Sequence, residues 1–259
     1  MQNEQTIETL NRMKLYGMAQ SLTGRLADAR QAELTHAEFV GLLAADEQAH
    51  RDCKRLRRLL RRAHMKQDAC LENIDYRRPR GLNKQTVLEL GNIAWLDGNR
   101  NVIITGPSGV GKSYIACALG NFAARCGRPV TYVRATRLFE TLSMARADGS
   151  HLRMIQNLAR ARLLIVDDFL IAPLTDSARM DFLEVIEERC GTGAMVITSQ
   201  CPSSDWHRNI GDDTIADAIC DRLLHQAYKL ELDCDSIRRY PLEKVEGKEP
   251  ENLKNGRQN

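Results

Sequence analysis

The chain has 259 residues, 43% of them hydrophobic, which is enough for one large or two smaller cores. Its composition and patterning exclude several classes of protein. The longest apolar runs are too short to span a bilayer, and residues 1–6 lack the layout of a secretion signal. Scattered cysteines and histidines argue against disulfides and a structural metal. We therefore expect a reduced, cytoplasmic protein without membrane contact, whose net charge of +3 is unevenly placed.

Residues 1–66 are predicted to form a small all-helical domain. Apolar residues from Ile7 to Leu26 recur at helical spacing, with interruptions at Gly17 and Gly24, which predicts one or two short helices. Thr35 and Glu38 have the spacing of a capping box. A longer helix is expected to run from there to about residue 65.

The second half of this longer helix carries the densest positive charge in the chain. Guanidinium groups on successive turns can follow a phosphate backbone independently of base sequence, which makes this face a candidate for binding DNA. The alternatives are a solvated surface helix and a helix that pairs with acidic groups of a neighbouring subunit. The basic residues of this face are Arg51, Lys54, Arg55, Arg57, Arg58, Arg61, Arg62 and Lys66.

Residues 67–100 are expected to link these helices to a second domain. The segment 73–81 is irregular, and a helix is predicted from about Asn83 to Trp95. A linker of this kind can lie against the base of a bound nucleotide. Tyr76 is therefore interpreted either as a contact to adenine or as a packed linker aromatic.

The central motif of the chain is a predicted phosphate-binding loop. The β-branched run 102–104 predicts a buried strand, and the glycine-rich loop follows at once, with a helical pattern beyond it. Glycines let successive backbone N–H groups face one anion, and the helix adds its positive end. Lys112 is expected to reach the β- and γ-phosphates of ATP, and the Ser113 hydroxyl to ligate Mg²⁺. The predicted nucleotide-binding residues are Gly106, Pro107, Ser108, Gly109, Val110, Gly111, Lys112, Ser113 and Tyr114.

A second strand is predicted at 130–134, followed by a helix capped by Thr136 and a short helix from about 152 to 159. This stretch contributes three further basic residues. Arg137, Arg146 and Arg153 face either a DNA groove or solvent, and the sequence leaves both possibilities open.

The apolar strand predicted at 163–168 ends in two adjacent carboxylates. The carboxyl ends of strands are where an open α/β sheet binds its ligands. Asp167 suits a water-mediated hold on Mg²⁺, and Asp168 suits polarising the water that attacks the γ-phosphate. The alternative is that the two aspartates only cap a turn after the buried strand.

The remaining pattern completes an expected five-stranded parallel sheet in a domain that spans residues 101–242. A helix opened by Asp176 or Ser177 precedes a strand at 194–200, whose tip offers Ser199 or Gln200 as a sensor of the γ-phosphate. A helix capped by Thr214 and a strand at 228–232 follow. Residues 243–259 are expected to form a disordered tail.

Several of these motifs together resemble the IstB family of AAA+ ATPases, which assist the transposition of insertion sequences and are related to the DnaC helicase loaders. The resemblance extends over about residues 7–240. Its carboxyl-terminal parts include a helical motif that contains Arg222 and a short motif that contains Arg238. The stretches that carry it are 10–19, 38–43, 106–113, 163–169, 196–200, 215–225 and 235–238.

This resemblance implies an ATPase that assembles as a homo-oligomer on double-stranded DNA, remodels the target and recruits a transposase. It also implies that Arg222 is an arginine finger for the ATP of the adjacent subunit and that Arg238 is a second sensor. The sequence departs from the wider AAA+ pattern at Asp168, where many members carry Glu, and at Gln200, where Asn is common.

Two other functions fit parts of the sequence. One is a replicative helicase loader, which would grip a helicase with its amino-terminal helices and touch single strands. The other is a small-metabolite kinase that uses the same phosphate loop, although no substrate pocket or lid is evident in the sequence. A preference for duplex DNA distinguishes the transposition helper from the loader.

Overall fold

Five parallel strands form the sheet in a computed structural model that describes residues 2–28, 34–77 and 80–233. The strand order is β2-β3-β4-β1-β5, and every recorded pairing is parallel, as the sequence predicted. Because β4 lies between β1 and β3, the loop after β1 and the carboxylates of β3 meet at one edge, on either side of the β4 tip. The strands are β1 Val102–Thr105, β2 Val130–Arg134, β3 Leu163–Phe169, β4 Ala194–Ser199 and β5 Tyr228–Glu231.

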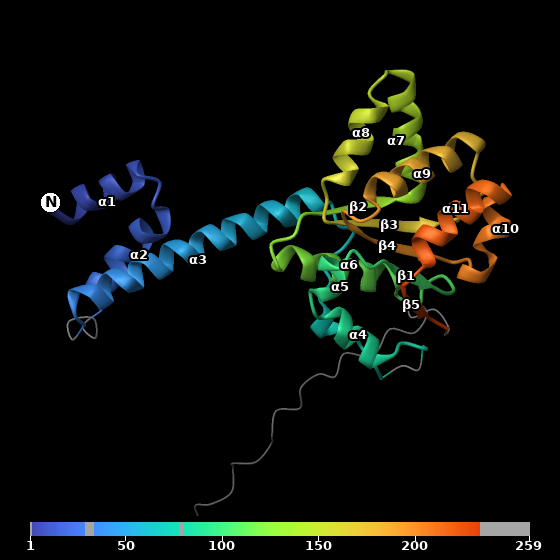
Figure 1. The fold of residues 1–259 in the computed structure, drawn as a ribbon. Coiled ribbons are helices and arrows are strands. Elements are labelled where there is room, and N and C mark those ends of the chain that lie inside the picture. Colours follow the sequence, from blue (N-terminus) through green and yellow to red (C-terminus); the bar gives the residue numbers. More distant parts are fainter. Residues whose placement is uncertain (1, 29–33, 78–79, 234–259) are drawn as a thin grey trace, which may run out of the picture.

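Both faces of the sheet are buried by helices (Figure 1). In β3, Leu163 and Ile165 pack into the core beneath α6 (Lys112–Arg125), whereas Leu164 and Val166 pack into the opposite core. The longer helices of the opposite core are α7 (Ala135–Ala147), α9 (Asp176–Arg189) and α11 (Asp213–Leu224), and the short helices α8 (His151–Ala159) and α10 (Trp206–Ile210) pack into it as well. A strand that is covered on both sides must be apolar at consecutive positions, which explains its unbroken hydrophobic run.

Three amino-terminal helices lie to one side of the sheet (Figure 1). The short helices α1 (Gln2–Arg12) and α2 (Tyr16–Ala27) precede the long helix α3 (His36–Ala63), and the predicted capping box is formed at its start. The buried carboxylate of Glu47 on α3 accepts a hydrogen bond of 2.7 Å from the backbone N–H of Gly17. This bond joins α2 to the first half of α3.

The second half of α3 reaches the α/β body. Ala63 at the end of the helix is fully buried in the core beneath α6, and Leu56 and Leu60 pack against the same core. The Arg55 guanidinium donates to the Gly127 carbonyl at 3.2 Å, just after α6. The long helix therefore connects the amino-terminal helices directly to the sheet domain.

Several predicted helix boundaries were wrong. The expected helix from Asn83 to Trp95 is two helices, α4 (Lys84–Leu90) and α5 (Ala94–Asp97), because the Asn92 side chain accepts from the Ala94 N–H and starts a new turn. Two starts also differ from those expected: Asp212 caps α11 in place of Thr214, and α7 begins at Ala135, before Thr136. By contrast, α9 begins at Asp176, as expected, and Thr175 is its cap.

The remaining described elements are short. None of the helices in the described ranges is both long and apolar enough to cross a membrane. The predicted tail, residues 243–259, and Arg238 lie outside the described residues. The short elements are η2 Leu71–Asn73, α8 His151–Ala159, η3 Ser203–Asp205 and α10 Trp206–Ile210.

A buried arginine organises the sheet on the side away from the site. Arg189 is 1% exposed and donates to the carbonyls of Leu158, Ala161 and Ala194, which connects α8, the start of β3 and the start of β4.

Arg189→Met should leave three carbonyls without this donor and lower the free energy of unfolding by about 3 kcal/mol. Urea denaturation measures the loss. Arg160→Met, on an exposed residue, is the control, and an equal loss in both variants would contradict this role.

Candidate nucleotide site

The phosphate loop follows β1 in a conformation that requires its glycines. Gly106, Gly109 and Gly111 have φ values of 142°, 87° and 98°, in the left-handed region that side chains disfavour. A Cβ at Gly106 would lie 2.1 Å from the carbonyl oxygen of Leu232, so the loop passes tightly against the residue after β5. The loop ends at Gly111, and α6 begins at Lys112, so the positive end of this helix lies at the cavity that Gly111, Lys112 and Ser113 line.

Lys112 is folded back across this loop. Its ammonium donates to the carbonyl oxygens of Gly106 and Pro107, each at 2.7 Å, and the residue is 6% exposed. Because the same ammonium lines the cavity, it is held where it can contact phosphate oxygens.

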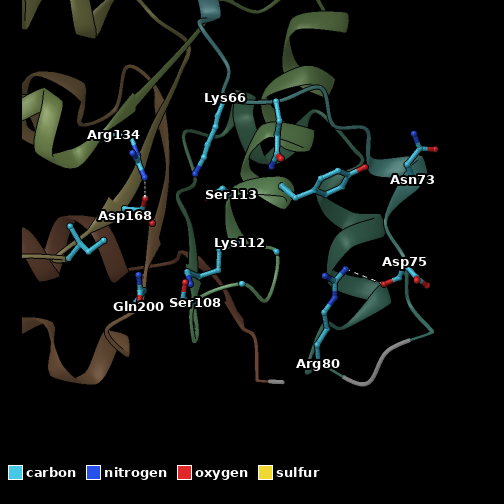
Figure 2. Close-up of a pocket in the computed structure, with 15 residues that line it drawn as sticks. Lys66, Asn73, Asp75, Arg80, Ser108, Lys112, Ser113, Arg134, Asp168 and Gln200 are labelled. Atoms are coloured by element: carbon cyan, nitrogen blue, oxygen red, sulfur yellow. Dashed lines mark hydrogen bonds and ion pairs between the residues drawn. The ribbon is translucent and has the colours of Figure 1, made fainter. Parts of the chain in front are cut away.

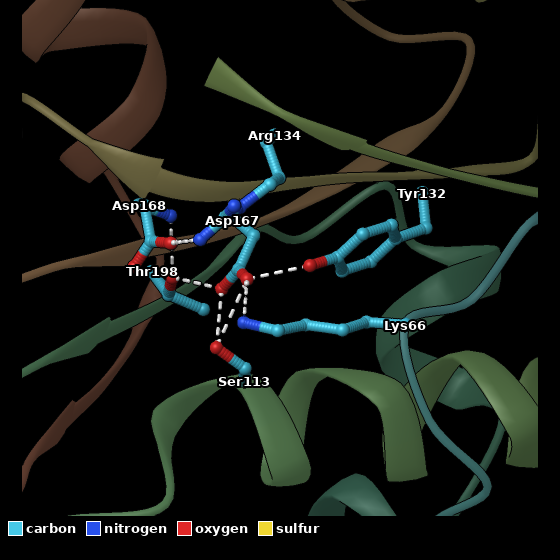
Figure 3. A network of polar contacts seen from close by, with 7 residues as sticks. All are labelled: Lys66, Ser113, Tyr132, Arg134, Asp167, Asp168 and Thr198. Carbon is cyan, nitrogen blue, oxygen red and sulfur yellow. Dashed lines mark hydrogen bonds and ion pairs between the residues drawn. The ribbon is translucent and has the colours of Figure 1, made fainter. Parts of the chain in front are cut away.

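A bulge at the end of β3 redirects the two carboxylates. The register of β3 against β4 shifts between Val166 and Phe169, and Asp168 has a left-handed φ of 61°. In a regular strand, neighbouring side chains point to opposite faces. Here Asp167 points toward α6 and Asp168 toward the end of β2, so that both flank the same site (Figure 3).

Asp167 is fully buried and surrounded by donors from separate elements. Its carboxylate accepts hydrogen bonds from the Ser113 hydroxyl at 2.8 Å, the Thr198 hydroxyl at 2.6 Å and the Tyr132 hydroxyl at 2.5 Å (Figure 3). The Lys66 ammonium forms an ion pair with the same carboxylate at 3.4 Å. These contacts connect α6, β4, β2 and the segment after α3.

The electrostatic balance of this cluster favours an ionised Asp167. Burial pushes its pKa up, but the hydrogen bonds from Thr198, Tyr132 and Ser113 and the charge of Lys66 outweigh burial, and the pKa lies below its ordinary value. The resulting stabilisation is present above the unfolded-state pKa and is lost as the pH falls through the folded-state pKa. For Tyr132, burial and the nearby carboxylate raise the pKa, so its hydroxyl remains a proton donor.

Asp168 and Gln200 lie at the rim of the cavity, close to the phosphate loop (Figure 2). The Asp168 carboxylate pairs with the Arg134 guanidinium at 3.0 Å, and the Asp168 N–H donates to the Thr198 hydroxyl at 2.9 Å. Of the two expected sensors, Ser199 is buried and donates to the Phe169 carbonyl, which leaves Gln200 as the one that lines the cavity.

These groups surround a cavity of about 550 Å³, which is large enough for a nucleotide. Eight predicted site residues line it: Ser108, Gly109, Gly111, Lys112, Ser113, Tyr114, Asp168 and Gln200. Asp167 is not among the lining residues, but its carboxylate accepts a hydrogen bond from Ser113, which is. The sequence reasoning missed seven further lining residues as parts of the site: Lys66, Gln67, Asn73, Asp75, Arg80, Arg134 and Ile171.

The linker contributes the end of the cavity away from β3. Asn73 and Asp75 line it, whereas the Tyr76 ring lies beneath the Lys84 ammonium, 5.9 Å from the ring centroid, and is not among the lining residues. Arg80 is 6% exposed and donates to the Val110 carbonyl in the phosphate loop at 3.1 Å. It also donates to the Asp75 carbonyl at 3.1 Å (Figure 2). No local pattern in the sequence marked Arg80, because its acceptor Val110 lies 30 residues further along the chain.

Arg222 lies away from this cavity. Its guanidinium donates to the Ala218 carbonyl and pairs with Glu187 at 3.0 Å, and the residue lies beside Asn101 at the opposite ends of the strands. It is therefore not a ligand of the nucleotide cavity in its own chain.

The predicted DNA-binding residues fall into two groups. Some are engaged within the chain: Arg51 pairs with Glu47, the Lys54 ammonium lies over the Tyr16 ring, and Arg55 donates to Gly127. Arg146 pairs with the buried Asp181 at 2.5 Å, in a cluster that also holds His151 and Glu184. Arg58, Arg62, Arg137 and Arg153 belong to the exposed surface of α3, α7 and α8.

The donor set at one end of the cavity fits Mg²⁺. This cation prefers hard oxygen ligands, and the Ser113 hydroxyl and Asp167 carboxylate oxygens lie together beside the phosphate loop. Ser113 is the candidate direct ligand and Asp167 the candidate partner of a metal-bound water.

This fold and this cavity define a P-loop ATP-binding protein of the AAA+ type. The description "IstB-like ATP binding protein" belongs to a family model that matches residues 8–244, and the chain is a member of that family. The structural comparison agrees with the fold. The chain is similar to the DnaC helicase loader, with a TM-score of 0.53 at 16% identity over 64% of this chain and 97% of that one.

Relatives in sequence are named for insertion sequences and for ATP binding. One from Sinorhizobium fredii is 44% identical over 234 residues, which is 90% of this chain and 96% of the relative. Another, from the insertion sequence IS1162 of Pseudomonas fluorescens, is 42% identical over 79% of this chain and 89% of the relative. The predicted family is thus confirmed.

Arg80 offers a test of the joint between the linker and the phosphate loop. Arg80→Met should remove the donor shared by Val110 and Asp75, loosen both walls of the cavity and weaken nucleotide binding about tenfold. Fluorescence titration with a labelled ADP measures the affinity. Arg160→Met, which removes an exposed guanidinium at the end of α8, away from the lining residues, is the control. An unchanged affinity in Arg80→Met would contradict the proposed role.

Proposed function

We propose that this protein is an ATP-dependent helper ATPase that assembles on double-stranded DNA, selects or remodels the target and recruits the transposase of an insertion sequence. The observation that carries the ATPase part is the convergence of Lys112, Ser113 and Asp168 on one cavity. Membership of the IstB-like family, with relatives named for insertion sequences, supports the biological setting.

The chain's own residues can divide the work of ATP hydrolysis. Lys112 and the N–H groups at the start of α6 bind the phosphates, while Ser113 and Asp167 hold Mg²⁺, which supplies charge neutralisation when bound. Asp168 accepts a hydrogen bond from the attacking water and polarises it, and Gln200 orients that water or contacts the γ-phosphate. The Arg134 ion pair positions the Asp168 carboxylate at the rim.

The position of Arg222 favours assembly. Because its guanidinium lies away from the nucleotide cavity of its own chain, it can serve as an arginine finger only for a neighbouring subunit. Hydrolysis would then depend on the contact between protomers. Arg238, the proposed second sensor, completes the set that the family resemblance implies.

A basic surface on the helices is the proposed contact with DNA. The exposed residues Arg58, Arg62, Arg137 and Arg153 are the first candidates, since guanidinium groups on helices can bind phosphates without reading bases. Arg51, Lys54, Arg55 and Arg146 would have to share their charge with the partners they already have. The proposed domains are the amino-terminal helices, residues 1–66, and the ATPase unit, residues 101–242, which residues 67–100 join.

Binding to duplex and single-stranded DNA of equal length should separate this function from that of a helicase loader. With ATP we expect tight, cooperative duplex binding that falls on the order of 10²-fold between about 50 and 200 mM salt, if four phosphates are contacted. ADP and nucleotide-free protein should bind weakly. Fluorescence anisotropy measures all of these affinities.

Lys112→Ala is the matched control for this experiment, because it should lose the ATP effect while it keeps the basic surface. Duplex binding that ignores ATP, or binding to single strands alone, would contradict the transposition-helper proposal. The second result would favour a loader.

Asp168→Asn tests the water-activating carboxylate. Asparagine tolerates the left-handed backbone of this position, so the fold should be kept, but it cannot accept a proton from water. We expect ATP affinity within about twofold of wild type and hydrolysis slowed about 10²-fold or more. Phosphate release on duplex DNA measures the rate. Asp176→Asn, at a carboxylate that is 97% exposed on α9, is the control, and undiminished turnover in Asp168→Asn would refute the role.

A further inference from the structure

Lys66 brings a cation to the metal end of the nucleotide site from outside the phosphate loop. It lies three residues beyond α3, and its ammonium reaches the fully buried Asp167 carboxylate at 3.4 Å (Figure 3). The other groups that donate to this carboxylate are the neutral hydroxyls of Ser113, Thr198 and Tyr132. Lys66 therefore supplies the countercharge that a buried carboxylate requires.

The position of Lys66 depends on how α3 is seated. Ala63 is fully buried, and Met65 packs so closely beneath α6 that a Cβ at Gly120 would lie 2.9 Å from its sulfur. These contacts fix the start of the segment that carries Lys66. Lys66 also lines the nucleotide cavity, and its side chain is 34% exposed, so the ammonium has room to leave Asp167.

A magnesium ion held by Ser113 and Asp167 would share the Asp167 carboxylate with the Lys66 ammonium. A divalent cation held between Ser113 and Asp167 would lie within a few ångströms of the ammonium, and two cations repel at that distance. Conversely, without a metal the ammonium is an attractive charge for phosphate oxygens that enter the cavity. The two cations therefore act in opposite directions on nucleotide binding.

We propose that Lys66 is a resident counter-ion that the magnesium nucleotide displaces from Asp167, so that the seating of the amino-terminal helix α3 sets the magnesium dependence of nucleotide binding. This inference rests on the proposed function of the site. Linkage makes the effect reciprocal: bound magnesium nucleotide weakens the attachment of the α3 end by the same factor by which that attachment weakens magnesium nucleotide binding. The amino-terminal helices thereby sense the state of the site.

The test compares the dissociation constant of a fluorescent ADP analogue with Mg²⁺ and with EDTA, on the full chain without DNA. The ratio of the EDTA value to the Mg²⁺ value measures magnesium dependence. Lys66→Met should increase this ratio about tenfold, because magnesium binding no longer meets repulsion and the metal-free nucleotide loses an attractive charge. Lys66→Arg should keep the wild-type ratio.

The control is Arg57→Met, which removes a positive charge from the exposed surface of α3, the helix that precedes Lys66. It should leave the ratio within about twofold of wild type. An unchanged ratio in Lys66→Met, an equal increase in Arg57→Met, or an increase in Lys66→Arg that matches Lys66→Met would each overturn the proposal. Failure of the wild-type chain to bind the analogue in either condition would instead refute the proposed nucleotide site itself.

Discussion

The burial of one carboxylate constrains the relative positions of most parts of this structure. Asp167 is fully covered, so donors must surround it, and they come from α6, β2, β4 and the segment after α3. The carboxylate is compensated for its burial only when all of these donors are in place together. The bulge of β3, the start of α6 and the segment after α3 are therefore held together by the same contacts that form the proposed magnesium site.

The basic side chains assigned to the ATPase site differ in whether they lie at the nucleotide cavity of their own chain. Lys112 and Lys66 lie inside the cavity of their own chain, whereas Arg222 points away from it beside Glu187. In the proposed reaction, the first kind binds and senses the nucleotide and the second completes the site of a neighbour. This division is the physical basis of the two proposals, that turnover depends on assembly and that the amino-terminal helices respond to the bound nucleotide.

Predictions from the sequence succeeded where neighbouring residues decide the structure. The β-branched strand, the glycine loop and the capping box at Thr35 all depend on contacts within a few positions, and all are present. Helix starts were predicted less well, because several adjacent polar residues can cap a helix and the sequence does not rank them. Asp212, and not Thr214, caps α11. The side chains of Asp167 and Asp168 reach the same site because β3 contains a bulge, and no local pattern in the sequence predicted that bulge.

The sequence by itself determined the phosphate loop, the parallel sheet and the order of the chain's functional motifs, because these follow from residue type and periodicity. Only the tertiary structure decided which distant side chains complete the site. Lys66 and Asp167 are 101 residues apart, Arg80 and Val110 are 30 apart, and Arg134 reaches Asp168 across the ends of two strands. A lysine or arginine on a charged helix or linker resembles any solvated residue until folding places it beside a buried acceptor.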